Sequence, residues 1–148
     1  MRLLILNGVN LNLTGFREKE IYGKETLEEI NERIRRYCLE NGDSVEFFQS
    51  NHEGILVDKL HEVFLHRSVD GIVLNAGAYT HYSYALRDAV AAIDIPVVET
   101  HMSDVFAREE FRKISVLSDV CVGLAYGLGV GSYFKAIDIL RSLKKSSD

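Results

Sequence analysis

Cysteine is scarce in this sequence, and its scarcity excludes two kinds of small protein. Only Cys38 and Cys121 occur, far apart, so neither a dense disulfide framework nor a zinc site of closely spaced cysteines is expected. We expect both thiols to be buried and reduced, Cys38 in a helix and Cys121 in an apolar strand. No set of histidines and carboxylates has metal-site spacing, so no metal is expected.

An excess of positive charge is also missing. The formal net charge is −5, whereas a general nucleic-acid binder normally shows a basic stripe. No apolar run approaches the length that crosses a bilayer, and the first residues turn polar too soon for a signal peptide. We therefore expect a cytoplasmic protein that binds neither nucleic acid nor membrane.

What the sequence has is the composition of an ordinary globular domain. Its 148 residues are 47% hydrophobic and 26% charged, which suits a single domain over residues 1–148 with its own core. Apolar runs predict strands at Arg2–Leu6, Ser44–Phe48, Gly71–Leu74, Ile95–Glu99 and Val120–Leu124. Helical spacing predicts helices at Thr26–Asn41, Gly54–His66, Tyr82–Ile93 and around Ser132–Leu143.

The expected helices carry further signals. Thr26 and Glu29 form a capping box at the start of the first, and Gly42 follows its end. In the second helix we expect five apolar side chains to face inward, those of Ile55, Leu56, Leu60, Val63 and Phe64.

Strands and helices in alternation predict an α/β fold, a parallel sheet covered by helices on both faces. Five strands with right-handed crossovers suit the flavodoxin-like, doubly wound order 2-1-3-4-5. In that order ligands bind beyond the C-terminal ends of the strands, where the winding reverses between the first and third. The segments that follow strands one, three and four should therefore form the functional site.

The segment after the first strand, Asn7–Asn12, is rich in asparagine and glycine. Such residues often stabilise a turn. The functional alternative is a donor array for a developing oxyanion, with Asn12, deepest in the loop, as its best candidate. Arg17 and Tyr22 follow in segment 14–23, which we interpret as a mobile lid. A free phenol ionises near pH ~10 and a nearby guanidinium favours the phenolate, so this pair could supply a general base.

Two more candidate side chains, Asn75 and His81, follow the third strand. In the plainer interpretation Thr80 caps the next helix and His81 is an exposed residue of its first turn. In the functional interpretation Asn75 and His81 recognise substrate hydroxyls at the crevice.

Glu99, His101 and Ser103 alternate after the fourth strand. Alternate side chains of an extended strand share a face, so Glu99 could fix the tautomer of His101 and support its imidazolium. His101 is then a candidate general acid. Ser103 is expected to cap a helix that carries Arg108 and Arg112, and these arginines with the helix N-terminus would trap a carboxylate. The plainer alternative for both arginines is a solvated helix face.

Two other polar segments are interpreted as structural. The run GLGVGS at 127–132 departs from both phosphate-binding glycine fingerprints, so we expect a tight turn between strand and helix. Residues 49–51, which follow the second strand, are expected to lie away from the site.

Several motifs resemble those of the type II 3-dehydroquinate dehydratases. In chain order they are ILNGVNLNL, GFRE, IYG, FFQSNHEG, NAGAYTHYSYALRDA, ETHMSD and ARE. The resemblance spans nearly the whole chain and implies a flavodoxin-like enzyme that converts 3-dehydroquinate to 3-dehydroshikimate, in the shikimate pathway or in quinate breakdown. Elimination of water beside a ketone needs a base, an acid and an enolate stabiliser but no electron sink, so no cofactor is expected.

The resemblance also implies roles for particular side chains. Tyr22 would be the base, kept ionised by Arg17. His101, oriented by Glu99, would protonate the departing hydroxyl, and Asn12 would hold the enolate oxygen through a water. The ring hydroxyls and carboxylate of the substrate would be bound by Asn75, His81, Met102, Ser103 and Arg112. Arg108 would support the site from behind these residues.

A neighbouring subunit is implied as well. By the resemblance Asp88 would reach the site of a second copy, in a homo-oligomer that is a dodecamer built from trimers. Its own surroundings, beside Arg87, indicate only an exposed helix residue.

Three alternative functions stay open. A non-catalytic flavodoxin-like module for a small anion or nucleotide would use the glycine run and be indifferent to Tyr22. A receiver-like domain would need clustered acidic residues after the first strand, where this chain has asparagines. A related lyase could act on a different hydroxyacid.

Overall fold

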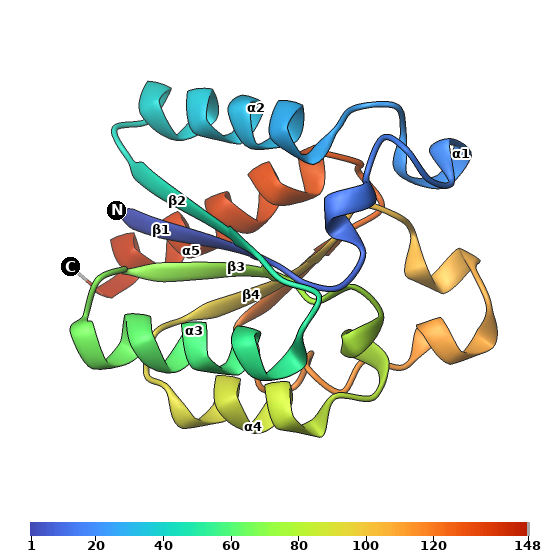
Figure 1. Cartoon of the computed structure of the whole chain (residues 1–148). Coiled ribbons are helices and arrows are strands. Elements are labelled where there is room, and N and C mark those ends of the chain that lie inside the picture. Colours follow the sequence, from blue (N-terminus) through green and yellow to red (C-terminus); the bar gives the residue numbers. More distant parts are fainter. Residues whose placement is uncertain (148) are drawn as a thin grey trace.

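The computed structural model describes residues 1–147 and contains one sheet of five parallel strands (Figure 1). The strands are β1 (Arg2–Asn7), β2 (Ser44–Gln49), β3 (Gly71–Asn75), β4 (Val97–His101) and β5 (Gly123–Tyr126). Their order across the sheet is β2-β1-β3-β4-β5. The predicted doubly wound order 2-1-3-4-5 is confirmed, so the winding reverses between β1 and β3.

Helices cover both faces of the sheet. The helices α2 (Leu27–Glu40) and α5 (Gly131–Ser147) lie on one face, and α3 (Glu53–His66) and α4 (Tyr84–Ala92) lie on the other (Figure 1). A short helix, α1 (Lys19–Tyr22), and four 3-10 turns lie around the C-terminal ends of the strands. These turns are η1 (Leu11–Leu13), η2 (Gly77–His81), η3 (Val105–Ala107) and η4 (Glu110–Lys113). No helix within residues 1–147 is both long and apolar enough to cross a membrane.

Two apolar cores result, one on each face of the sheet. In β1, Leu3 and Ile5 pack into the core under α2 and α5, whereas Leu4 and Leu6 pack into the core under α3 and α4. Successive side chains of a strand point to opposite faces, so a central strand buried on both faces is apolar throughout. This explains why the unbroken run in β1 predicted a buried parallel strand.

Some predicted boundaries and orientations are wrong. The fifth strand starts at Gly123, because the N–H groups of Val120 and Cys121 both bond to the Leu117 carbonyl in a preceding turn. Cys121 is therefore half-buried and lies before the strand, while Cys38 is fully buried in α2 as predicted, and both thiols are free.

The predicted inward orientation of Ile55 is also wrong. Ile55 is 43% exposed, because it lies beside the stripe that α3 buries, which is formed by Leu56, Leu60 and Val63.

The start of α2 follows the predicted capping box. The N–H of Glu29 donates to Thr26 Oγ1 at 3.2 Å, and the N–H of Thr26 donates to Glu29 Oε2 at 2.8 Å. Gly42 follows the helix with a φ of 74°, a left-handed conformation that suits glycine.

The plainer interpretation, in which Thr80 caps α4, is wrong. The turn η2 takes up residues 77–81, so α4 starts at Tyr84, and Ser83 Oγ accepts the N–H of Leu86 at 3.0 Å. The hydroxyl of Thr80 is buried and has no hydrogen-bond partner within residues 1–147.

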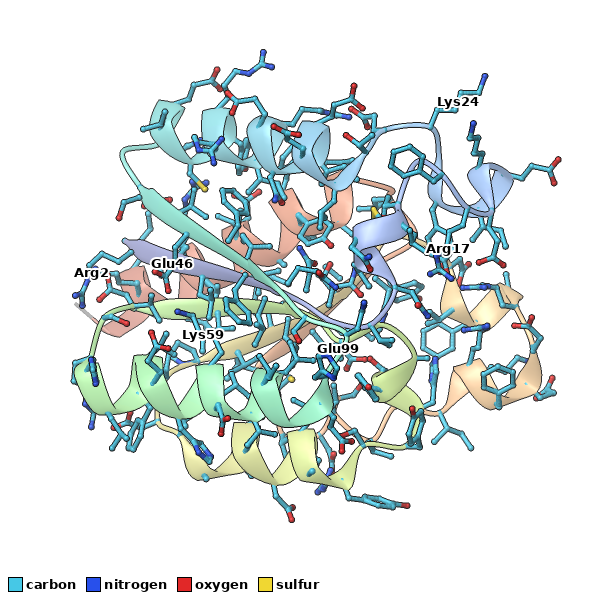
Figure 2. The ribbon with its side chains drawn as sticks, viewed as in Figure 1. Arg2, Arg17, Lys24, Glu46, Lys59 and Glu99 are labelled. Atoms are coloured by element: carbon cyan, nitrogen blue, oxygen red, sulfur yellow. The ribbon has the colours of Figure 1, made fainter. Side chains whose placement is uncertain are left out.

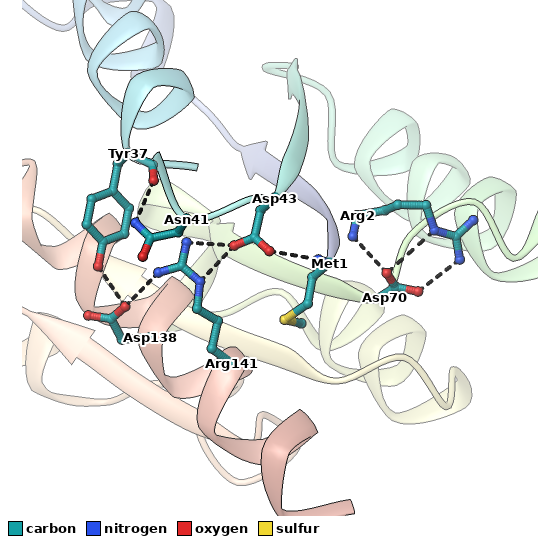
Figure 3. Close-up of polar contacts among 8 residues, drawn as sticks. All are labelled: Met1, Arg2, Tyr37, Asn41, Asp43, Asp70, Asp138 and Arg141. Atoms are coloured by element: carbon teal, nitrogen blue, oxygen red, sulfur yellow. Dashed lines mark hydrogen bonds and ion pairs between the residues drawn. The ribbon is translucent and has the colours of Figure 1, made fainter. Parts of the chain in front are cut away.

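Ion pairs fix the strand starts, at the end of the sheet opposite to α1 (Figure 3). The Met1 ammonium nitrogen lies 2.7 Å from Asp43, which Arg141 Nη2 approaches at 2.6 Å. Burial opposes the charge of Asp43, but both cations outweigh it and lower its pKa. Hydrogen bonds from the Arg2 side chain and backbone lower the pKa of Asp70 to about 2.

Candidate active site

A pocket of about 120 Å³ lies beyond the C-terminal ends of β1, β3 and β4. Its polar lining comes from Asn10, Arg17, Tyr22, Asn75, His81, His101, Ser103, Arg108 and Arg112. The three segments that we expected to converge do meet here. They meet because the winding reverses between β1 and β3, which are neighbours in the sheet, and because β4 adjoins β3.

Three predicted site residues do not line this pocket: Asn12, Asp88 and Glu99, the last of which lies behind His101 and binds it. Asn12 is exposed on η1, so the prediction that it lies deepest in its loop is wrong. Asn10 adopts a left-handed backbone, φ 66°, and the following turn buries Leu11 and leaves Asn12 outside. Asp88 is exposed on α4 and does not line the pocket of its own chain.

The loops after β1 and β3 touch through two glycines. The N–H of Gly8 donates to the Asn75 carbonyl at 2.7 Å, and a Cβ on Gly8 would lie 2.3 Å from the Ala76 carbonyl oxygen. Gly77 has a φ of +63°, and a Cβ there would lie 2.6 Å from the Val9 carbonyl oxygen. Only a residue without a side chain fits at either position.

Residues 49–51, at the end of β2 and directly after it, do not line the pocket, as predicted, but two of them hold a loop that does. Asn51 Oδ1 accepts the N–H of Asn10 at 2.9 Å, and Gln49 Nε2 donates to the Gly8 carbonyl at 3.1 Å. These side chains therefore hold the loop that follows β1.

Tyr22 contacts two guanidinium groups. Arg108 Nη1 donates to Tyr22 Oη at 2.8 Å and to Ser103 Oγ at 3.3 Å. Arg17, on the loop before α1 (Figure 2), lies over the ring of Tyr22, 4.7 Å from its centroid, and pairs with Glu18. We expected Arg108 to stand behind the site, but it lines the pocket and is the guanidinium that reaches the phenol oxygen.

The contact predicted between Glu99 and His101 is present on β4. His101 Nε2 lies 2.7 Å from Glu99 Oε1, and both side chains are buried. A carboxylate only accepts hydrogen bonds, so Nε2 carries the proton. The ring of His101 lines the pocket, and Nδ1 is the ring nitrogen that Glu99 does not bind.

Two serines that the sequence did not single out also bind Glu99. Ser115 Oγ donates to Oε1 at 2.8 Å, and Ser118 Oγ donates to Oε2 at 2.5 Å. Burial disfavours the charge of Glu99, but the hydrogen bonds from His101, Ser118 and Ser115 outweigh it and lower the pKa of Glu99. Both serines lie in an irregular segment, where no periodicity marks them.

The second pocket histidine is held differently. His81 Nδ1 lies 2.7 Å from the carbonyl oxygen of Ile114, so this nitrogen carries the proton. Burial lowers the pKa of His81, with smaller contributions from His101 and Arg112. His81 is therefore a neutral imidazole whose Nε2 is an acceptor.

Asn75 is oriented from below by a fully buried tyrosine. Asn75 Nδ2 donates to Tyr133 Oη at 2.9 Å, and that hydroxyl donates to Asn7 Oδ1 at 2.7 Å. Tyr133 lies on α5 and was not identified from the sequence, because its aromatic side chain looks like an ordinary core residue there.

The predicted carboxylate trap lacks its helix. Asp104, rather than Ser103, is the capping residue, and it starts the 3-10 turn η3 instead of an α-helix. Arg112 lies in the separate turn η4 and pairs with Glu109. Met102 and Ser103 line the pocket with Arg112, so the expected side chains are present without the helix dipole.

The glycine run forms the tight turn that we predicted. Gly127 and Gly129 have φ values of 78° and 58° between β5 and α5. Within residues 1–147, no cluster of histidine, cysteine and carboxylate side chains is arranged to hold a metal ion.

Comparison with known proteins places the chain in a family. The family model for dehydroquinase class II matches residues 1–141. The chain is 49% identical over 142 residues to the 3-dehydroquinate dehydratase of Caldicellulosiruptor bescii, covering 96% of this chain and 97% of that protein. The corresponding protein of Thermotoga neapolitana is 44% identical over 147 residues, with 99% of each covered.

Solved structures agree with this assignment. The type II dehydroquinase of Butyrivibrio crossotus DSM 2876 is 50% identical, with a TM-score of 0.93 over 95% of this chain and 97% of that one. The type II dehydroquinase of Propionibacterium acnes is 36% identical, with a TM-score of 0.90 over 95% and 96% of the two chains. The chain therefore belongs to the class II dehydroquinase family.

Proposed function

We propose that Tyr22 and His101 are the base and the acid with which this chain, a 3-dehydroquinate dehydratase, removes water from 3-dehydroquinate. One observation supports this assignment above the others. A phenol bound to a guanidinium and an imidazole bound to a carboxylate line the same small pocket. A water elimination beside a ketone requires such a base and such an acid.

The first step is removal of a proton from the carbon beside the ketone. Tyr22, as the phenolate, takes this proton, and the ketone becomes an enolate. The hydrogen bond from Arg108 and the cation of Arg17 over the ring place two positive charges beside the phenol, where they stabilise the negative charge that the base carries in this step.

In the second step the enolate collapses and the carbon–oxygen bond to the hydroxyl breaks. His101 gives that oxygen a proton, so it leaves as water and the product is 3-dehydroshikimate. The lowered pKa of Glu99 supports this role, because a charged carboxylate beside Nε2 stabilises the imidazolium before the proton is given up.

The rest of the pocket is proposed to hold the substrate. Asn75, Ser103 and Arg112, with Met102, offer donors and one guanidinium to its hydroxyls and carboxylate. His81 Nε2 is proposed to accept a hydrogen bond from a substrate hydroxyl. Asn12 lies outside the pocket, so its hold on the enolate oxygen would have to run through a water, which is the contact that we propose.

Asp88 is proposed to complete the pocket of a second copy in a homo-oligomer, a dodecamer of trimers. Its exposure on α4 is compatible with this role. Light scattering should then give a particle mass about twelve times the 16.7 kDa of one chain. We further propose a cytoplasmic location and a place in the shikimate pathway.

The activity is tested by mixing the purified protein, treated with a chelator, with 3-dehydroquinate and following the absorbance of the conjugated enone product. We expect prompt product formation that the chelator does not slow. If the protein is folded and gives no product, 3-dehydroquinate is not its substrate. That result would favour a small-anion binding module or a lyase for another hydroxyacid.

A further inference from the structure

We propose that Ser115 and Ser118 are positioning residues that act on His101 through Glu99, an inference that rests on the proposed function. Both serines lie outside the pocket lining, in the irregular segment between η4 and β5. Their hydroxyls nevertheless donate to the carboxylate that holds the imidazole, at 2.8 Å and 2.5 Å.

The direction of the Ser115 hydroxyl is fixed by its other contacts. Its oxygen accepts the N–H groups of Leu117, at 3.1 Å, and of Ser118, at 3.2 Å. Both lone pairs are therefore occupied, and the single proton of the hydroxyl points to Glu99. Oε1 of Glu99 thus receives two donors, Ser115 and His101, while Ser118 supplies the donor on Oε2.

A carboxylate in this position needs these donors. Glu99 is fully buried on β4, and a buried carboxyl group without partners becomes neutral. With its three donors Glu99 is an anion, as its lowered pKa indicates. A carboxylate anion accepts the hydrogen bond from Nε2–H and stabilises the imidazolium of His101, whereas a neutral carboxyl group would do neither as well.

The segment that carries the serines is held independently of any substrate. Arg87 on α4 donates from Nη1 to the Val116 carbonyl at 2.8 Å and pairs through Nη2 with Asp119 at 3.0 Å. The N–H of Val116 donates to the Thr80 carbonyl at 2.9 Å. The serine hydroxyls are therefore set before the substrate arrives, as positioning requires.

Other titratable groups surround this pair without binding its carboxylate. Cys121 lies near Glu99, and burial raises the pKa of its thiol to about 12, so it is neutral. His81 is neutral across the pocket. The remaining charged or phenolic groups of the pocket are Arg17, Tyr22, Arg108 and Arg112. In the described part of the chain, the side-chain donors to the Glu99 carboxylate are His101 and the two serines.

The test compares Ser118→Ala with Ser118→Thr, which keeps a hydroxyl. The control is Ser142→Ala, which removes an exposed hydroxyl on α5 that bonds only to its own helix. One readout is the pH dependence of kcat with 3-dehydroquinate. The other is the titration and tautomer of the His101 ring by nitrogen NMR without substrate.

For Ser118→Ala we expect kcat to fall about tenfold while KM stays within about twofold. The basic limb of the kcat profile and the NMR titration of His101 should both move to higher pH by roughly one unit, the size expected when a buried charge loses one hydrogen bond. The sign follows because losing a donor destabilises the unprotonated, negatively charged pair of Glu99 and His101 more than the protonated, neutral pair. Ser118→Thr should restore both, and Ser142→Ala should change neither.

A loss of activity that is uniform in pH, with an unmoved His101 titration, would overturn the proposal, because a purely structural serine would behave in that way. If the wild-type protein fails to dehydrate 3-dehydroquinate but Ser118→Ala still shifts the His101 titration, the proposed function fails and the positioning role stands. Should Ser118→Ala not fold, Ser118→Cys keeps the size with a weaker donor and gives the same two readouts.

Discussion

Arg108 and Tyr22 are 86 positions apart in the chain, yet Nη1 of the arginine lies 2.8 Å from the phenol oxygen. Arg17, five positions before the tyrosine, contacts only the face of its ring. Sequence proximity suggested the nearer arginine as the partner of the phenolate, and the fold supplies the distant one. The two arginines therefore have different geometries toward the proposed base, and their effects should be separable.

Removing the phenol oxygen should abolish most of the activity. Tyr22→Phe keeps the ring and its contact with Arg17, so the circular dichroism spectrum should not change, while kcat falls by at least about 10²–10⁴-fold, the usual contribution of a general base. Tyr82→Phe, at an exposed ring outside the pocket, is the matched control and should keep full activity. Near-normal turnover by Tyr22→Phe would show that another group takes the proton.

The two arginines should differ in how much each contributes to kcat/KM. Arg108→Ala removes the donor to the phenol oxygen, and we expect a loss of about 10–100-fold, the value of one charge-assisted hydrogen bond. Arg17→Ala leaves that hydrogen bond in place and should lower kcat/KM less. A larger loss with Arg17→Ala would mean that Arg17 is the cation on which Tyr22 depends.

Stability in acid should depend on the pair between Arg2 and Asp70 (Figure 3). The pKa of Asp70 is lowered from 3.8 to about 2 in the folded protein. Its contribution to stability is therefore fully present above the pKa of the unfolded state and is lost as the pH falls toward 2. At neutral pH, Asp70→Asn should lower the free energy of unfolding by about 1–2 kcal/mol, after discounting for partial exposure. Urea titrations at several pH values check this: the difference from the wild type should shrink between about pH 4 and pH 2. Asp94→Asn, in an exposed pair with Arg67, should cost little at any pH.

The unpartnered hydroxyl of Thr80 offers a stabilising change. Its oxygen is buried without a hydrogen bond in the described part of the chain, so Thr80→Val removes the cost of a buried polar group and keeps the side-chain shape. We expect the free energy of unfolding to rise by about 1 kcal/mol, measured by denaturant titration, with activity unchanged. A loss of stability would reveal that the hydroxyl has a partner in the folded enzyme. Thr100→Val is the contrasting control, because that buried hydroxyl donates to the Ala125 carbonyl and its removal should destabilise.

The sheet and the place of the site were predictable because they depend on regular patterns. The apolar run of β1 and the turn signals around it determine a buried parallel strand, and the strand order determines which loops meet. The contact between Glu99 and His101 was also predictable, since alternation along one strand places both on one face.

The misplaced residues lie in segments without a repeat. Asn12 and Arg108 belong to 3-10 turns or their ends, where no period indicates which side chain points inward. Ser115 and Ser118 reach Glu99 because distant groups, such as Arg87, hold their segment. Such positions are set by tertiary contacts, and a single sequence carries no local signal for them.

The crossing of the loops at Gly8 and Gly77 limits how this pocket can change during evolution. Each loop occupies the space that a side chain on the other would need, so neither glycine can gain a side chain unless the loops move, and this part of the pocket border is closed to point mutation. Variation in substrate preference must then arise at the walls, where Val9, Ala78 and Val105 line the pocket. A library that aims at another hydroxyacid should randomise those three positions and leave both glycines untouched.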